Sequence, residues 1–197
     1  MKRGEASRSR ILETARDILA REGLDRFALR EIAKRAGMRL GNLQYYFPTR
    51  DDLLDAVIQS EFDHNLQMMR ALDERASDLR GYMQRLSELL IEEYTSVGGN
   101  IWPVLNFLRL HNRRFRQLSA VIYQQHFDII AAAMRKFGVT DKPGTLLGKA
   151  RLMTAVIDGA SLQAHAGRHS HASRSWKSLC KKNGRNGDRH RRSLREN

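Results

Sequence analysis

Residues that interrupt helices or cross-link a chain are scarce in this sequence. Its 197 residues include three prolines and a single cysteine, Cys180. One cysteine cannot form a disulfide within the chain, which excludes a disulfide-stabilised scaffold and fits a reducing cytoplasm. Because prolines are few and apolar residues recur at helical spacing, we predict an all-α fold.

Long apolar runs are also missing. No stretch reaches the roughly 20 apolar residues that a membrane-spanning helix requires. The N-terminal sequence MKRGEASRSR lacks the apolar segment of a secretory signal peptide. We therefore expect a cytoplasmic, nucleoid-associated protein of bacterial type that has no membrane partner.

Signals for catalysis or metal binding are weak. The stretch GTLLGKA at 144–150 is too short for a phosphate-binding P-loop and lacks Ser or Thr after its lysine. His165, His169 and His171 have a metal-like spacing, which we interpret as incidental in a basic segment. No Ser/His/Asp or Cys/His set stands at a defined spacing. We expect no enzyme activity, no cofactor and no metal site.

Acidic residues are too few to balance the basic ones. The net charge of +13 indicates a polyanionic partner, most simply nucleic acid. The excess is uneven, because residues 166–197 contain ten Lys or Arg against two Asp or Glu. More than half of the excess positive charge therefore lies in this C-terminal stretch.

The most specific pattern lies at residues 29–51. An apolar stripe at helical spacing predicts a short helix there. Gly37 follows the stripe, where a residue in the left-handed conformation ends a helix without a Cβ penalty. A second short helix is expected at about 40–47, stopping before Pro48. The stripe of the first helix consists of Leu29, Ile32, Ala33 and Ala36.

On a helical wheel the second short helix has two different sides. Leu40, Leu43, Tyr46 and Phe47 form the buried side, and Gly41, Asn42, Gln44 and Tyr45 form the outward side. The outward side offers amides that pair with adenine, a ring for a thymine methyl and a glycine for close approach. A helix-turn-helix places such a helix in the DNA major groove. The flanking Arg30, Arg39 and Arg50 are placed to meet phosphates, or a guanine edge for the first two.

The segment before this pair completes a three-helix unit. A stripe at about residues 7–22 predicts another helix, Gly23 is a plausible C-cap, and Phe27 is expected beneath the junction. With these features, residues 8–58 resemble the N-terminal domain of the tetracycline-repressor (TetR) family. The resemblance rests on the Gly23–Phe27 junction, the Ile32-Ala33 and Ala36-Gly37 pairs, and Gly41-x-Leu43-x-x-Tyr46-Phe47 followed by a basic residue and acids. It implies base-reading roles for Arg30 and Gln44, and phosphate contacts for Tyr45, Tyr46 and Arg50.

Two positions depart from the family pattern. Members usually have Ser or Thr where the second helix starts, and often Ser before the third. This chain has Phe27-Ala28 and Arg39 there. Both are N-cap positions, and a missing cap costs about 0.5–2 kcal/mol. Arg39 could replace a lost hydroxyl contact with a charge, so the sequence does not indicate which operator is read.

Further helical stripes are expected at about 51–72, 78–97, 101–110, 115–137 and 144–165. Asp51 and Asp52 favour the N-terminus of the first of these through the helix dipole. The resemblance implies that this bundle binds a small-molecule effector, forms a homodimer and is coupled to the DNA-binding unit by the helix from Asp51. We therefore divide the chain into a DNA-binding domain (1–50), a ligand-binding and dimerisation domain (51–166) and a basic tail (167–197).

The effector pocket is harder to assign than the DNA-binding unit. Its candidates combine apolar walls with a few polar groups, although each such residue is more often simply part of the core. The candidates are His64, Met68, Tyr94, Trp102, Phe107, His111, Tyr123 and His126. Asp158-Gly159 resembles a family feature of the dimer-forming helix, the alternative being a simple kink.

The C-terminal tail is unusual for this family, whose dimer interface usually uses two helices from each subunit. Residues 144–165 match the first, and the second is expected at about 170–190. Only Trp176, Leu179 and Cys180 are spaced there for one apolar helical turn, and the composition favours disorder. One hypothesis is a basic arm that adds non-specific phosphate contacts. The other, favoured by the abrupt change near Gly167, is an aberrant replacement of a normal dimer helix.

The leading interpretation is a sequence-specific transcriptional regulator of double-stranded DNA, most simply a repressor that a small-molecule ligand releases from a palindromic operator. An alternative is a sequence-independent nucleic-acid binder driven by the basic tail. A third class, a small-molecule enzyme or carrier, would use the bundle alone.

Overall fold

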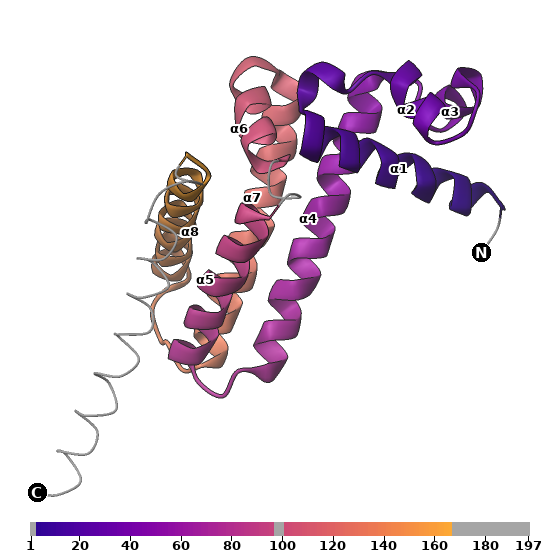
Figure 1. Ribbon diagram of the computed structural model, residues 1–197. Coiled ribbons are helices and arrows are strands. Elements are labelled where there is room, and N and C mark those ends of the chain that lie inside the picture. The colour runs from indigo at the N-terminus through magenta and orange to yellow at the C-terminus, as the bar shows by residue number, and fades with distance from the viewer. Residues whose placement is uncertain (1–2, 97–100, 167–197) are drawn as a thin grey trace, which may run out of the picture.

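The computed structural model describes residues 3–96 and 101–166, and every regular element in these two ranges is helical. Figure 1 shows α1, α2 and α3 gathered at one end of the molecule, and the long α4 running from them into a bundle with α5 to α8. The prediction of an all-α fold is confirmed. The elements are α1 (Arg3–Glu22), the 3-10 turn η1 (Leu24–Arg26), α2 (Leu29–Arg35), α3 (Leu40–Tyr46), α4 (Arg50–Arg75), α5 (Leu79–Thr95), α6 (Ile101–His111), α7 (Arg113–Lys136) and α8 (Pro143–Ala166).

The N-terminal unit closes around apolar residues that the sequence spaces for helices. Phe27, predicted beneath the junction, is 1% exposed. It belongs to the same buried cluster as Ile11 of α1, Ile32 of α2 and Leu43 of α3, each 0% exposed. The helix α1 begins at Arg3, four residues before the predicted start, so its first turn extends beyond the apolar stripe that marked it.

The turn between α2 and α3 depends on Gly37. Its φ of 66° lies in the left-handed region, as predicted, where only glycine avoids a Cβ clash. The Gly37 amide donates to the Lys34 carbonyl at 3.1 Å, and the Met38 amide donates to the Ala33 carbonyl at 3.0 Å. These two bonds form a Schellman motif that satisfies the last carbonyls of α2. Met38 then packs back against the core, and the chain re-enters a helix at Leu40.

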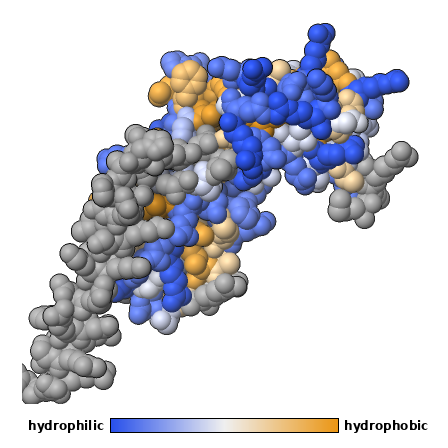
Figure 2. Space-filling view, in the orientation of Figure 1, coloured by the Kyte–Doolittle hydropathy of each residue, from blue (hydrophilic) through white to orange (hydrophobic). Residues whose placement is uncertain are grey.

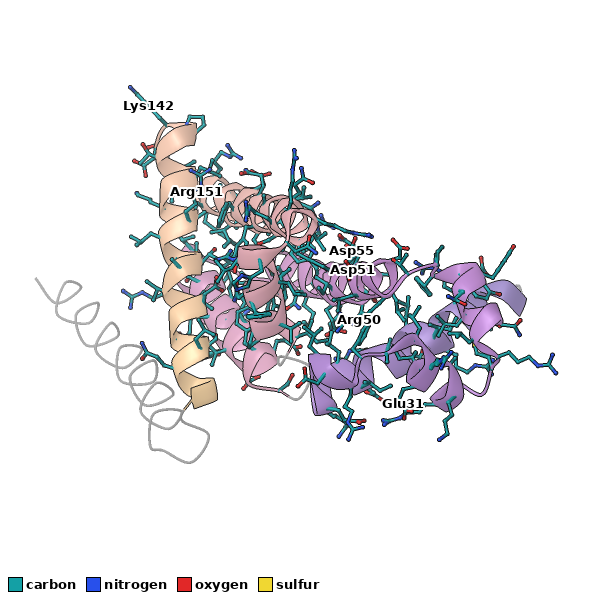
Figure 3. The ribbon with its side chains drawn as sticks, turned by 90° about the horizontal axis from the view of Figure 1, so that it is seen from above. Glu31, Arg50, Asp51, Asp55, Lys142 and Arg151 are labelled. Carbon is teal, nitrogen blue, oxygen red and sulfur yellow. The ribbon has the colours of Figure 1, made fainter. Side chains whose placement is uncertain are left out.

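The start of α4 is fixed by a capping box. The Thr49 hydroxyl accepts the Asp52 amide at 3.1 Å, and the Asp52 carboxylate accepts the Thr49 amide at 3.0 Å. Arg114, at the start of α7, donates to the same Asp52 carboxylate at 2.9 Å and also pairs with Asp55. Figure 3 shows Asp51 and Asp55 where α4 leaves the N-terminal unit. One acidic turn therefore joins the N-terminal unit, α4 and the bundle.

Apolar side chains of α4 continue the core from one end of the molecule to the other. Leu53, Leu54 and Phe62 are each 0% exposed, and they belong to one cluster with Tyr82 of α5 and Phe115 of α7. The two units therefore share a single hydrophobic core. No helix in the described part of the chain has the length and apolar character that would let it cross a membrane.

The capping box gives a test of this junction. Thr49→Ala removes the hydroxyl that accepts the Asp52 amide, so the free energy of unfolding is expected to fall by about 1 kcal/mol. The measurement is the urea unfolding midpoint. Thr140→Ala, at an exposed threonine outside the helices, is the matched control. An equal loss in both variants would contradict a capping role for Thr49.

Candidate functional site

The outward side of α3 is exposed as the helical wheel predicts. Gly41, Asn42 and Gln44 are exposed, and the Tyr45 ring is 83% exposed. Between them, Leu43 is fully buried and fastens the helix to the core. Hydrophilic side chains dominate the face of the N-terminal unit that Figure 2 shows. A short helix with polar side chains outward and one apolar anchor inward has the form of a DNA recognition helix.

Two further predicted DNA-binding residues lie beside this surface. Arg30 on α2 and Arg39 at the N-cap of α3 are both exposed. The absence of caps is confirmed, because neither Ala28 nor Arg39 supplies a side-chain hydrogen bond to its helix. The exposed side of α3 thus has an arginine where many helices have a small hydroxyl group.

The two tyrosines at the end of α3 differ in exposure. The half-buried Tyr46 packs against the core and contacts Tyr45 edge to face, with ring centroids 5.2 Å apart. Both rings line a surface hollow of about 190 Å³ between the start of α1 and α3. Arg10 and Asn42 line the same hollow. The predicted phosphate contacts of Tyr45 and Tyr46 therefore lie next to a basic side chain.

Arg50 has a role that the sequence did not indicate. Its guanidinium donates to the backbone carbonyls of Phe27 at 2.7 Å and Leu24 at 2.9 Å. It also lies over the Phe27 ring, 5.8 Å from the centroid. Figure 3 places it between the N-terminal helices and the bundle. Arg50 thus ties α4 to η1, and its phosphate contact stays a prediction.

In the bundle, half of the predicted pocket residues come together. Trp102 of α6 lies 5.2 Å from Tyr94 of α5 and 6.3 Å from His126 of α7, measured between ring centroids. Tyr123 lies 6.3 Å from His126. We call Tyr94, Trp102, Tyr123 and His126 the aromatic cluster.

The other half lies elsewhere. His64 is exposed on α4. Phe107 and His111 are exposed on α6, where their ring centroids lie 4.9 Å apart. Met68 is half-buried on α4, away from the residues that line the cavity at the aromatic cluster. Helical spacing alone could not separate these positions from the cluster, because it does not show which side of a bundle helix faces its neighbours.

A small cavity adjoins the aromatic cluster. Its volume is about 20 Å³, room for roughly one water molecule. The Tyr123 hydroxyl donates to the Asp158 carboxylate of α8 at 2.8 Å, and both residues line the cavity. Burial raises the pKa of Asp158, and the Tyr123 hydrogen bond and Arg109 oppose this shift. The remaining lining residues are Tyr94, Trp102, Pro103, Asn106, Ser161 and Leu162.

Sequence analysis missed Asp158 as a pocket residue, although it noted the Asp158-Gly159 pair. The signal was a single acidic residue on a largely apolar helix. It also missed Phe62 of α4, whose ring lies 4.9 Å from His126. The structure places Phe62 in the core and against the cluster at once.

His126 is buried without hydrogen-bond partners. It is 1% exposed, and neither ring nitrogen has a hydrogen-bond partner within residues 3–96 and 101–166. Burial lowers its pKa from 6.5 to about 4, so the imidazole is neutral at physiological pH. A buried polar group without a partner costs about 1–3 kcal/mol. The bundle therefore carries an unfavourable polar group beside its cavity.

The pH dependence of stability tests this description of His126. Between pH 6.5 and 4 the unfolded chain binds a proton at His126 that the folded protein does not, so the free energy of unfolding falls with pH in this window. On acidification from pH 7.5 to 4, the free energy of unfolding is expected to fall by about 3 kcal/mol more in the wild-type protein than in the His126→Leu variant. Urea unfolding at several pH values measures the difference.

His64→Leu, at an exposed histidine, is the matched control and is expected to keep the wild-type loss. If His126→Leu were to lose as much stability as the wild type, the neutral buried state of His126 would be wrong.

Comparisons with known proteins agree with this architecture. The family model described as "Bacterial regulatory proteins, tetR family" matches residues 11–57. An uncharacterized HTH-type transcriptional regulator in the dhlA 5'region of Xanthobacter autotrophicus is 28% identical over 130 residues, which cover 58% of this chain and 64% of that protein. The chain thus matches slightly less than two thirds of that relative's length.

Solved structures extend the likeness over most of the chain. A regulator from Saccharomonospora viridis, in complex with choline, is 25% identical with a TM-score of 0.75, covering 90% of this chain and 94% of its own. A TetR-family regulator from Rhodococcus sp. is 21% identical with a TM-score of 0.70, covering 89% and 95%. The N-terminal unit and the bundle behind it therefore follow a known arrangement.

Proposed function

Because this chain belongs to the tetR family of bacterial regulatory proteins, we propose that it is a transcriptional repressor that a small molecule releases from a palindromic DNA operator. The observation that carries the proposal is the outward side of α3, where Asn42, Gln44 and Tyr45 are exposed on a helix anchored by Leu43. Amide side chains pair bidentately with adenine in the major groove, and arginines pair with guanine or phosphate. The DNA-binding residues are Arg30, Arg39, Gly41, Asn42, Gln44, Tyr45, Tyr46 and Arg50, the last also holding η1.

Base reading by α3 can be measured directly. Gln44→Ala is expected to weaken binding to a selected operator by about 1–3 kcal/mol and to relax base preference at one position of each half-site. Selection of DNA from a random pool, followed by titration, measures both effects. Gln67→Ala, at an exposed glutamine of α4, is the matched control. If the Gln44→Ala variant kept the wild-type base preference, the outward side of α3 would not be the surface that reads the bases.

Release by a small molecule is supported by the contacts that connect the cavity with the DNA-binding unit. The helix α7 carries Tyr123 and His126 at the aromatic cluster, and Arg114 at its start pairs with Asp52 in the capping box of α4. A ligand that moves α7 would therefore act on the start of α4. Such a switch requires only that the ligand binds one arrangement more tightly than the other. The regulator from S. viridis, which has a similar fold, was solved in complex with choline, and this supports small-molecule binding here.

A homodimer is the form in which two copies of α3 reach two half-sites. Its support is the outer face of α8, where Leu152 is 68% exposed and Val156 is 52% exposed. These residues are one helical turn apart, so they form an apolar strip that a second α8 can cover. The predicted second dimer helix at 170–190, and the basic tail, lie outside the described residues.

Disruption of this strip tests the dimer. Val156→Asp places a charge in the proposed interface and is expected to raise the dimer dissociation constant by more than about tenfold. Analytical ultracentrifugation over a concentration series measures this constant. Val121→Asp, at a 55% exposed valine of α7, is the matched control. A dimer that survives Val156→Asp unchanged would place the interface elsewhere.

The alternative of a sequence-independent nucleic-acid binder driven by the basic tail is not favoured. The family membership and the exposed amides of α3 both support reading of base sequence.

A further inference from the structure

The cavity at the aromatic cluster has an unusual combination of lining groups. Its walls include the rings of Tyr94, Trp102 and Tyr123, which come from three different helices. Among the described residues that line it, Asp158 is the one with a charged side chain, and it is an acid. Aromatic faces attract cations through the ring quadrupole, most strongly where water is excluded. A carboxylate beside such faces supplies a counter-ion.

We propose that the effector is a compact organic cation, such as a quaternary ammonium compound, held against Trp102, Tyr94 and Tyr123 with Asp158 as its counter-ion. This inference rests on the proposed function, because it names the ligand class of the same regulatory site.

The bond between Tyr123 and Asp158 explains how a ligand enters so small a cavity. These two residues also line a surface groove of about 680 Å³ on the other side, between α6, α7 and α8. They are the only residues that line both hollows in the described chain. Separation of the Tyr123 hydroxyl from Asp158 therefore joins the cavity to the groove. The cation replaces the hydroxyl as the partner of the carboxylate.

The arginines near the site line the groove and not the cavity. Arg109 lines the groove only, where it lies over the Tyr123 ring at 5.5 Å and donates to Ser119 at 3.4 Å. Arg116 donates to the carbonyls of Arg109 and Leu110. Arg151, labelled on α8 in Figure 3, lies over the ring of Phe127. Each guanidinium is engaged on the groove side; Arg109 attracts Asp158 from there and so favours its carboxylate form.

His126 adds a second polar contact to the site. Its ring lies 6.3 Å from those of Trp102 and Tyr123, measured between centroids, and both of its nitrogens lack partners among the described residues. A neutral imidazole can hydrogen-bond a ligand hydroxyl without repelling its ammonium group. A small displacement of the two rings would open the cavity to this histidine. The site therefore fits a cation that also carries a hydroxyl group.

The test compares choline with 3,3-dimethylbutan-1-ol, which has nearly the same shape and hydroxyl but no charge. Calorimetric titration of the full chain gives both dissociation constants, and thermal unfolding confirms them, since a ligand of the native state raises Tm. Choline is expected to bind at least about tenfold more tightly than the uncharged alcohol.

Two variants assign this preference to the cavity. Asp158→Asn keeps the shape of the side chain and is expected to weaken choline binding about tenfold, while the affinity for the alcohol stays the same. Trp102→Leu removes the aromatic ring face and is also expected to weaken choline binding. Asp128→Asn, at an exposed acid of α7, is the matched control. If Asp158→Asn does not fold, Trp102→Leu carries the test.

Equal affinities for choline and the alcohol, or a preference that both variants leave intact, would overturn the cation site. A rise in Tm with acetate and not with choline would also overturn it and would indicate an anionic effector. Operator binding is measured separately by footprinting without ligand. If the protein protects a specific operator and choline does not bind, the proposed ligand class is wrong and the proposed function stands. If the protein protects no specific DNA sequence, the result counts against the proposed function.

Discussion

The fold depends on one helix that belongs to two packed units. The apolar side of α4 contributes Leu53 and Leu54 near the N-terminal unit and Phe62 farther into the bundle, all within one buried cluster. Close-packed cores transmit displacement because they contain few voids that could absorb it. The ion pairs of Arg114 with Asp52 and Asp55 add a polar connection at the point where α4 begins. No flexible linker separates the DNA-binding unit from the bundle.

The polar groups of the bundle carry a cost that a stable core would avoid. In the part of the chain that the structure describes, the two nitrogens of His126 and the side-chain oxygen of buried Asn65 have no hydrogen-bond partner. Apolar residues of similar size would remove this desolvation penalty. The His126 ring lies 6.3 Å from the rings of Trp102 and Tyr123, which line the cavity, so a ligand group that reached it would supply the missing partner.

Sequence reasoning succeeded where a local pattern determines the structure. The Leu29–Ala36 stripe, the left-handed Gly37 and the alternation of buried Leu43 with exposed Gln44 are local, and each was predicted correctly. The cavity was predicted in part only, because its residues come from α5, α6, α7 and α8. Asp158 looks like a helix irregularity until its contact with Tyr123 is known. The bonds of Arg50 to the Phe27 and Leu24 carbonyls join residues 23 and 26 positions apart, so local spacing does not predict them.

The Arg114 ion pairs give the connection between bundle and α4 a dependence on solution conditions. Arg114 is exposed, with 44% of its side chain accessible, so dissolved ions screen its attraction to Asp52 and Asp55. The Thr49–Asp52 capping box consists of short-range hydrogen bonds and persists when the ion pairs weaken. Rising ionic strength would thus loosen the link to α7 while it also weakens phosphate contacts to DNA.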